Sequence, residues 1–218
     1  MIQDTMPEVA RYWNRSAEAF DSIYTGRKSP VARTLDQVLR RDMYQRFEWV
    51  MARAGDVRGR SVCDIGCGSG RYVAEFARRG AARAVGVDVA PEMLRLATLV
   101  AEQEGRSSIC EFVQADVLDW RPSERFDISI AIGLWDYIAD PGPRLGVIHD
   151  LTSDTFLSAW PRLWTWRMPI RKARLTAAGC PVYFFRRADV YRHLEAANFV
   201  VESCEVIGKL YCVVARPR

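Results

Sequence analysis

The sequence predicts an α/β protein. It has a mostly parallel sheet of seven strands with helices on both faces, an antiparallel hairpin at the C-terminal end and a helical cap at the N-terminal end. Two observations predict this class. From Ser61 onward, short apolar runs alternate with segments whose apolar residues recur at helical spacing, the pattern of βαβ units. Near the C-terminus, little more than Gly208 separates two apolar runs, which predicts a hairpin of antiparallel strands.

The N-terminal segment, residues 1–58, is the predicted cap. Apolar residues at helical spacing predict helices between residues 6 and 54, and the stretch at 25–30, TGRKSP, interrupts them. No βαβ unit requires this segment, so we expect it to fold over a site at the sheet edge. Residues 59–218 then form the main domain.

The main domain is predicted element by element from its apolar patterns. We expect strands near 61–65, 84–88, 109–114, 127–132, 154–160, 199–207 and 209–216. We expect helices near 69–79, 91–104, 142–151 and 188–197. In open α/β sheets, ligands bind outside the carboxyl ends of the strands, so the loops that follow the strands are the places to look for a site.

Composition narrows the class of protein. The chain has 218 residues, 49% of them hydrophobic, and a formal net charge of +4, which is ordinary for one globular domain. No apolar stretch has the length of a membrane span, and the N-terminus lacks the apolar region of a secretory signal, so we expect a cytoplasmic protein. The six cysteines are scattered without metal-ligand spacing, which favours structural thiols over a metal site or disulfides.

The glycine-rich stretch after the first strand indicates the ligand. Asp64 precedes glycines spaced G-x-G-x-G, whereas the dinucleotide fingerprint is G-x-G-x-x-G. A carboxylate there repels a pyrophosphate, which disfavours an NAD-dependent oxidoreductase, but it suits an ammonium group. Asp88 ends the second strand, where a carboxylate can accept both ribose hydroxyls, and Asp116 follows the third strand, where it can accept from an exocyclic amine. Together these residues fit S-adenosylmethionine, with S-adenosylhomocysteine as its product.

Four motifs in register resemble the class I S-adenosylmethionine-dependent methyltransferases, which have a Rossmann-like fold. They are VCDIGCGSGRY, GVDVAPEML, FVQADVLDW and FDISIAIGLWDYIADP, within residues 61–160. The resemblance implies that Asp64 and the glycines hold the methionine part, that Asp88 holds the ribose, and that Met93 packs on the adenine. The donor-binding residues it implies are Asp64, Gly66, Cys67, Gly68, Asp88, Val89, Met93, Asp116, Val117, Ile132, Gly133 and Tyr24.

The overall layout is similar to that of magnesium-protoporphyrin O-methyltransferases and related small-molecule enzymes. Those proteins have an Ile-His-Tyr-Pro turn after the fourth strand, whereas this chain has Trp135-Asp136-Tyr137-Ile138. Asp136 thus stands where the family has histidine, and the similarity is one of architecture. Asp136 and Tyr137 are candidate catalytic residues because they follow the strand that borders the donor. His149 is a third candidate, because histidine is the usual general base near neutral pH.

The segment at 161–187 is an insert with an unusual composition. Between Thr155 and Ala188 there are seven Arg or Lys residues and no Asp or Glu, and the insert is rich in aromatics. A loop of this length is usually a lid or a binding element. We expect a lid over an apolar or aromatic acceptor, anionic acceptors included; peripheral membrane contact and a solvated basic face are the alternatives.

The predicted function is methyl transfer from S-adenosylmethionine to a small-molecule acceptor, with O-methylation favoured. A nucleic-acid methyltransferase is the alternative, but the turn GLWDYIADP lacks the Asn/Asp-Pro-Pro-aromatic motif that acts on exocyclic amines, so no stable nucleic-acid partner is expected. A donor-binding protein without catalysis would show a broken glycine loop, and this one is intact. We predict no metal, and the sequence does not predict an oligomeric state.

Overall fold

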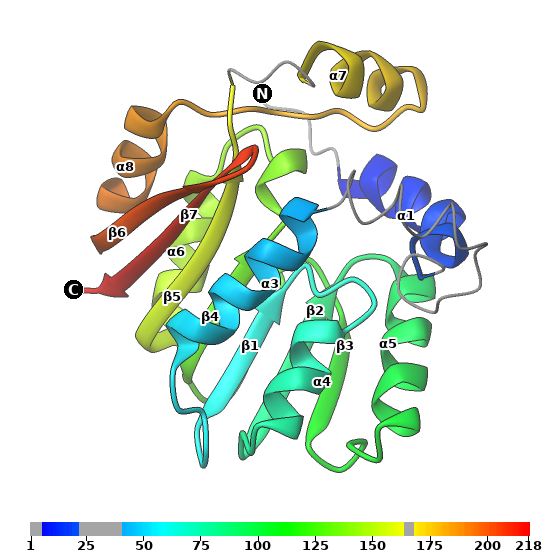
Figure 1. Cartoon of the computed structure of the whole chain (residues 1–218), viewed down its shortest axis with the longest axis vertical. Coiled ribbons are helices and arrows are strands. Elements are labelled where there is room, and N and C mark those ends of the chain that lie inside the picture. Colours follow the sequence, from blue (N-terminus) through cyan, green and yellow to red (C-terminus); the bar gives the residue numbers. More distant parts are fainter. Residues whose placement is uncertain (1–5, 22–40, 164–167) are drawn as a thin grey trace.

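A computed structural model describes residues 6–21, 41–163 and 168–218 (Figure 1). Seven strands form one sheet in the order β3-β2-β1-β4-β5-β7-β6. The strands are β1 (Ser61–Ile65), β2 (Arg83–Asp88), β3 (Cys110–Gln114), β4 (Phe126–Ile132), β5 (Thr152–Pro161), β6 (Phe199–Ile207) and β7 (Leu210–Pro217). Strand β7 runs antiparallel to both of its neighbours, and the pairs among β1 to β5 are parallel. The predicted fold class is confirmed.

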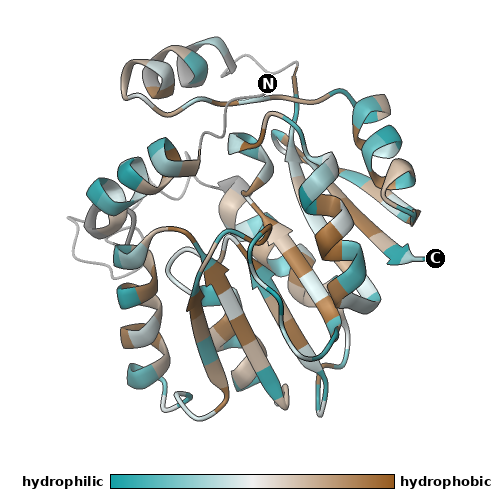
Figure 2. Ribbon diagram, turned by 180° about the vertical axis from the view of Figure 1, so that it is seen from behind, coloured by the Kyte–Doolittle hydropathy of each residue, from teal (hydrophilic) through white to brown (hydrophobic). Residues whose placement is uncertain are grey.

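Helices flank the sheet on both faces. They are α1 (Met6–Asp21), α3 (Arg41–Ala54), α4 (Arg71–Arg78), α5 (Pro91–Gln103), α6 (Gly142–Leu151), α7 (Met168–Ala177), α8 (Arg187–Ala196) and the short 3-10 helix η1 (Trp135–Tyr137). One apolar core joins α3 and α4 to the sheet through residues such as Val50 and Phe76. A second core joins α6 and α8 to the opposite face through residues such as Ile148 and Leu194. Figure 2 shows apolar residues gathered along the central strands between these layers.

The hairpin at the C-terminal end forms as predicted. Gly208 takes a φ of 55° in the turn between β6 and β7, a left-handed conformation that glycine adopts without steric cost. Strand β7 lies between β5 and β6, so β7 joins the hairpin to the sheet and β6 is the edge strand. This arrangement places the β6–β7 turn beside the end of β5, where the backbone N–H of Arg162 donates to the carbonyl of Lys209.

Two short helices were not predicted. Helix α7 lies inside the insert, where we expected a loop, and η1 follows β4 directly. The α7 sequence, MPIRKARLTA, explains the first difference, because Pro in the first turn and the Ala, Arg, Lys and Leu that follow it favour a helix. The pattern was hidden because it is short and lies within an aromatic, basic stretch.

The N-terminal helices have different positions. Helix α1 packs against α5 at the carboxyl edge of the sheet (Figure 1). Helix α3 instead buries Val50, Met51 and Ala54 in the core of the main domain. Residues 41–54 are therefore an integral layer of the α/β sandwich, and α1 alone has the place of a cap among the described residues. The predicted interruption at 25–30 lies outside the described residues.

Candidate functional site

The loop between β1 and α4 is left-handed at three glycines. Gly66, Gly68 and Gly70 have φ values of 75°, 52° and 69°. At Gly70 a Cβ atom would lie 2.7 Å from the Cβ of Ala97, so close packing excludes a side chain there. At Gly68 a Cβ would meet no atom of the described residues within 4 Å. The space beside the backbone of Gly68 is therefore open, so a ligand can contact the main chain there.

The carboxylate of Asp88 fixes this loop. Its Oδ2 accepts the backbone N–H of Gly68 at 2.9 Å, and its Oδ1 accepts the N–H of Ala90 at 2.9 Å. Burial raises the pKa of Asp88 above its ordinary value, and the hydrogen bonds from Ala90 and Gly68 oppose that rise. The backbone N–H of Val89 also lowers this pKa, so three N–H groups face the carboxylate, and its remaining lone-pair capacity is available to a ligand hydroxyl.

Asp64 lies beside the loop with one oxygen unsatisfied. Its side chain is buried, and Oδ2 has no hydrogen-bond partner among the described residues. Burial raises the pKa of Asp64 well above its ordinary value, and repulsion from Asp88 raises it further. A buried polar atom without a partner is rare in proteins and needs an explanation. A cationic N–H donor in the adjacent space would satisfy this oxygen.

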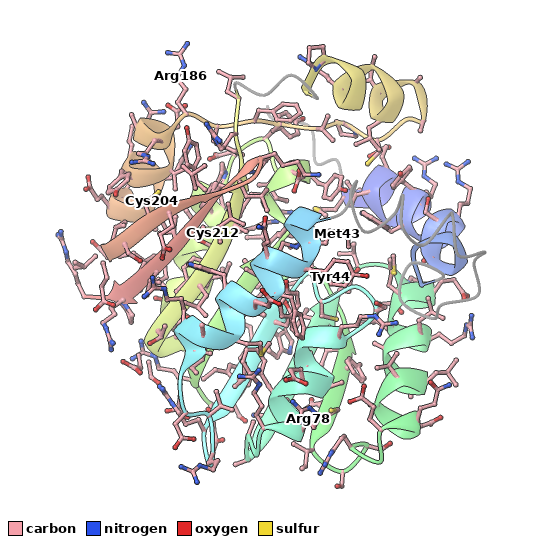
Figure 3. The ribbon with its side chains drawn as sticks, in the orientation of Figure 1. Met43, Tyr44, Arg78, Arg186, Cys204 and Cys212 are labelled. Atoms are coloured by element: carbon pink, nitrogen blue, oxygen red, sulfur yellow. The ribbon has the colours of Figure 1, made fainter. Side chains whose placement is uncertain are left out.

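Arg46 is a site residue that the sequence did not indicate. It lies in the first half of α3, and Figure 3 shows that the helix end carrying Met43 and Tyr44 points toward the carboxyl edge of the sheet. Nη1 of Arg46 lies 3.5 Å from the position that a Cβ of Gly133 would occupy, at the end of β4. Its positive charge opposes the rise in the pKa of Asp64. One guanidinium therefore stands near the Asp64 carboxylate and the end of β4.

Asp116 is held from two sides. Its Oδ1 accepts the backbone N–H of Leu118 at 3.0 Å, within its own loop. Its Oδ2 accepts from Nη2 of Arg144 at 2.5 Å, and both side chains of this ion pair are largely buried. Val117 is buried beside it. Arg144, in the first turn of α6, is a second residue that the sequence analysis missed.

Met93 lies in an apolar cluster at the start of α5, after the loop that follows β2. It is buried in a small cluster with Ala90, Leu96 and Ala17 of α1. Trp13 of α1 packs against the same cluster. Asn14 of α1 also accepts the backbone N–H of Glu92 at 3.2 Å, so α1 satisfies one of the free N–H groups at the start of α5. These contacts hold α1 at the edge of the sheet where the glycine loop lies.

The segment after β4 carries the two candidate catalytic residues of η1. Ile132 is buried, and Gly133 has a φ of 91° that turns the chain into η1. The Tyr137 ring meets the Trp13 ring edge-on at a centroid distance of 5.9 Å. Asp136 is buried, and its carbonyl accepts the backbone N–H of Tyr183 at 2.8 Å. Helix η1 is therefore in contact with both the N-terminal helix and the insert.

The two ends of the insert are joined by backbone hydrogen bonds. The N–H of Phe185 donates to the carbonyl of Pro161 at 2.9 Å, and the N–H of Leu163 donates to the carbonyl of Phe185 at 3.0 Å. Cys180, Val182 and Phe185 are buried in the core on the α6 side. Figure 1 shows α7 beyond the end of the sheet that also carries α1, and Figure 3 shows Arg186 projecting outward from that end.

One predicted residue, His149, lies away from this edge. His149 lies near the end of α6, directly before β5 begins, and therefore at the amino end of the parallel strands. There its Nδ1 lies 3.2 Å from Oδ1 of Asp150, and its ring packs edge-on against Phe199. Tyr24 lies outside the described residues. The other predicted donor residues lie at the carboxyl ends of β1 to β4 or just after them: Asp64, Asp88 and Ile132 belong to the strands, Met93 belongs to the first turn of α5, and the rest, Cys67 and Val89 included, belong to the loops.

No helix in the described part of the chain is long and apolar enough to cross a membrane. All six cysteines are free thiols. Burial raises the pKa of Cys67 well above its ordinary value, as expected for a packing residue under the glycine loop.

Comparison with known proteins agrees with the geometry of the site. Residues 62–151 match the family profile described as "Methyltransferase domain". Over 98 residues the chain is 35% identical to the ubiquinone biosynthesis O-methyltransferase of Acinetobacter baylyi, which is 44% of this chain and 40% of that protein. The corresponding protein of Aeromonas salmonicida is 28% identical over 106 residues, or 49% of this chain and 44% of that protein. The chain spans less than half the length of these curated relatives.

Two solved structures share the fold over nearly the whole chain. Magnesium protoporphyrin IX methyltransferase from Synechocystis, with bound SAH, superposes with a TM-score of 0.77 at 17% identity and covers 96% of this chain and 98% of its own. Geranyl diphosphate C-methyltransferase from Streptomyces coelicolor superposes with a TM-score of 0.75 at 14% identity, covering 100% and 99%. At these identities the likeness establishes the fold alone, and it confirms the Rossmann-like architecture.

Proposed function

We propose that this chain, whose residues 62–151 match a methyltransferase-domain profile, transfers the methyl group of S-adenosylmethionine to a small-molecule acceptor. The observation that carries the proposal is the buried, unsatisfied oxygen of Asp64 beside a bare glycine loop. An amino-acid ammonium group supplies the N–H donors that this oxygen lacks. A dinucleotide pyrophosphate would instead place negative charge against Asp64 and Asp88.

The donor fits the remaining groups of the site in the same way. Asp88 keeps acceptor positions for the ribose hydroxyls, and Asp116 with Val117 lies where an adenine amine can be bound. Arg46 adds a role that the sequence did not predict, because a guanidinium is suited to the donor's carboxylate. Met93 supplies an apolar surface for the adenine.

When bound, S-adenosylmethionine supplies an electrophilic methyl group on a sulfonium. The chain's own contribution is to position the acceptor and to exclude water. Tyr137 and Asp136 follow β4, so they are the residues we assign to the acceptor side. An acceptor that is already ionised at neutral pH, such as a carboxylate, needs no general base. His149 lies at the other edge of the sheet and has no role in this proposal.

The acceptor we propose is apolar or aromatic, with an oxygen nucleophile. The similarity to ubiquinone biosynthesis O-methyltransferases supports the oxygen, and the basic, aromatic insert at 161–187 supports an anionic acceptor beneath a lid. Helix α1 acts as the cap over the donor in this proposal, and α3 together with residues 59–218 forms the donor-binding domain. A cytoplasmic location and contact of the insert with a membrane surface stay predictions of the sequence.

Calorimetry with S-adenosylhomocysteine, and with NAD as a control, tests the donor. Binding of NAD without binding of S-adenosylhomocysteine would overturn the proposal. A donor with a labelled methyl group then tests phenols, carboxylates and an RNA pool as acceptors. Labelling of RNA alone would favour the nucleic-acid alternative.

Charge reversal in α7 tests the lid. With Arg171→Glu and Arg174→Glu together, we expect a higher KM for an anionic acceptor and unchanged affinity for S-adenosylhomocysteine. The matched control is Arg78→Glu with Arg79→Glu in α4, at the opposite end of the molecule from Arg186 (Figure 3). Equal acceptor kinetics in the two double variants would show that the insert is only a basic surface.

A further inference from the structure

Arg144 is a charged residue in an unfavourable place. It lies in the first turn of α6, where the partial positive charge of the helix N-terminus repels a cation. It is also largely buried, with a side-chain exposure of 10%. A buried guanidinium at this position does not help the helix, so its partner has to account for it.

The partner is Asp116, in the loop after β3, whereas α6 connects β4 to β5. Nη2 of Arg144 lies 2.5 Å from Oδ2 of Asp116, and the backbone N–H of Leu118 holds Oδ1 at 3.0 Å. The two contacts come from different parts of the chain and fix the plane of one carboxylate. Each oxygen keeps one acceptor position, so the carboxylate stays able to receive a ligand's N–H group.

The same segment also carries the acceptor side. Helix α6 begins five residues after η1 ends, and η1 contacts Trp13 through Tyr137 and the insert through Asp136. A cation in the first turn of α6 therefore ties the loop after β3 to the segment after β4. This ion pair is a polar side-chain link between the loop after β3 and the start of α6.

We propose that Arg144 is a positioning residue that orients the Asp116 carboxylate toward the exocyclic amine of the donor's adenine, and thereby selects a 6-amino purine over a 6-oxo purine. The inference rests on the proposed function, because it needs the donor to bind at this edge. The proposal concerns the preference for one purine over the other, and a residue that acts on stability alone would leave that preference unchanged.

The test compares S-adenosylhomocysteine with S-inosylhomocysteine, in which a carbonyl oxygen replaces the amine. Wild-type protein should bind the adenosyl compound at least tenfold more tightly, because a carbonyl oxygen would face the carboxylate. In Arg144→Met the ratio of the two dissociation constants should fall about tenfold. Arg144→Lys, which keeps the charge but not the planar fork, should recover part of the ratio. Arg192→Met removes an exposed guanidinium from its pair with Asp189 and should leave the ratio unchanged.

The outcomes separate the two proposals. If Arg144→Met weakens both ligands equally, so that the ratio is kept, Arg144 is merely structural and the inference is overturned. If wild-type protein binds both ligands equally, Asp116 does not read the amine and the inference is again overturned. If wild-type protein binds neither ligand, the proposed function itself fails, and the inference falls with it.

Discussion

Replacement of Arg46 by methionine tests the most consequential contact of the site. Methionine keeps an unbranched apolar stem in α3 but removes the guanidinium that lies beside Gly133 and opposes the raised pKa of Asp64. If Arg46 binds the donor's carboxylate, the variant loses a charge-assisted hydrogen bond, which is worth about 1.5–3 kcal/mol. That loss corresponds to a roughly 10- to 150-fold weaker affinity for S-adenosylhomocysteine.

Calorimetry with two ligands makes the prediction specific. The second ligand is the decarboxylated analogue of S-adenosylhomocysteine, which keeps the ammonium, ribose and adenine. Wild-type protein should bind the analogue more weakly than S-adenosylhomocysteine, and Arg46→Met should bind the two about equally. Arg53→Met is the control on the same helix, because Arg53 pairs with Glu205 on β6, and it should bind both ligands as wild-type protein does.

The result that would refute this reasoning is an equal loss for both ligands. In that case Arg46 would act on the fold or on the ionisation of Asp64, and not on the carboxylate. Thermal unfolding of each variant separates these two explanations. An effect through Asp64 alone leaves the fold intact and disappears as the pH rises above the pKa of Asp64.

Three further predictions concern the loop acids and glycines. Asp88→Ala should weaken S-adenosylhomocysteine binding by roughly tenfold or more, whereas unchanged affinity in a folded variant would exclude the ribose contact. In denaturant unfolding, Gly70→Ala should cost more stability than Gly68→Ala, because both strain a left-handed residue by about 1–2 kcal/mol but only Gly70 faces the Cβ of Ala97 at 2.7 Å. The pKa of Asp64 is raised on folding, so stability should fall as pH rises from 3.8 through the higher folded pKa. Asp64→Asn should reduce that slope, and the raised pKa of Asp88 should account for part of what remains.

The parts of the fold that depend on local pattern were predictable. Each βαβ unit has its own apolar periods, so every strand and helix predicted from Ser61 onward agrees with the structure to within a few residues, and of the described elements there only the short α7 and η1 were not predicted. The acids at the strand ends follow from the same rule, because parallel strands present their carboxyl ends at one edge. Asp64, Asp88 and Asp116 therefore reach the edge that the sequence predicted.

Residues on flanking helices were not predictable in the same way. Whether Arg46 reaches the site depends on how α3 packs across the sheet. The helical period of the sequence predicts which face of α3 is buried, but not the part of the sheet on which that face packs. The role of Arg144 could not be predicted because its partner, Asp116, lies 28 residues earlier in the chain, in a different loop. His149 shows the opposite error, because it was proposed for the site and lies away from it. Helix α6 runs from the carboxyl edge of the sheet back to the start of β5, so its last turn, with His149, lies at the amino ends of the parallel strands.

The charges of the donor site explain why one residue governs both stability and binding. Asp64 and Asp88 are buried beside each other, and Arg46 contributes the nearby positive charge. Burial and repulsion from Asp88 raise the pKa of Asp64 well above its ordinary value, so ionisation of Asp64 is disfavoured relative to an exposed carboxyl group. A ligand's ammonium group reverses that preference, because it supplies the N–H donors and positive charge that the buried oxygen lacks. In the proposed function, the unsatisfied oxygen that is unfavourable in the free protein is thus the same group that binds the ammonium of the donor.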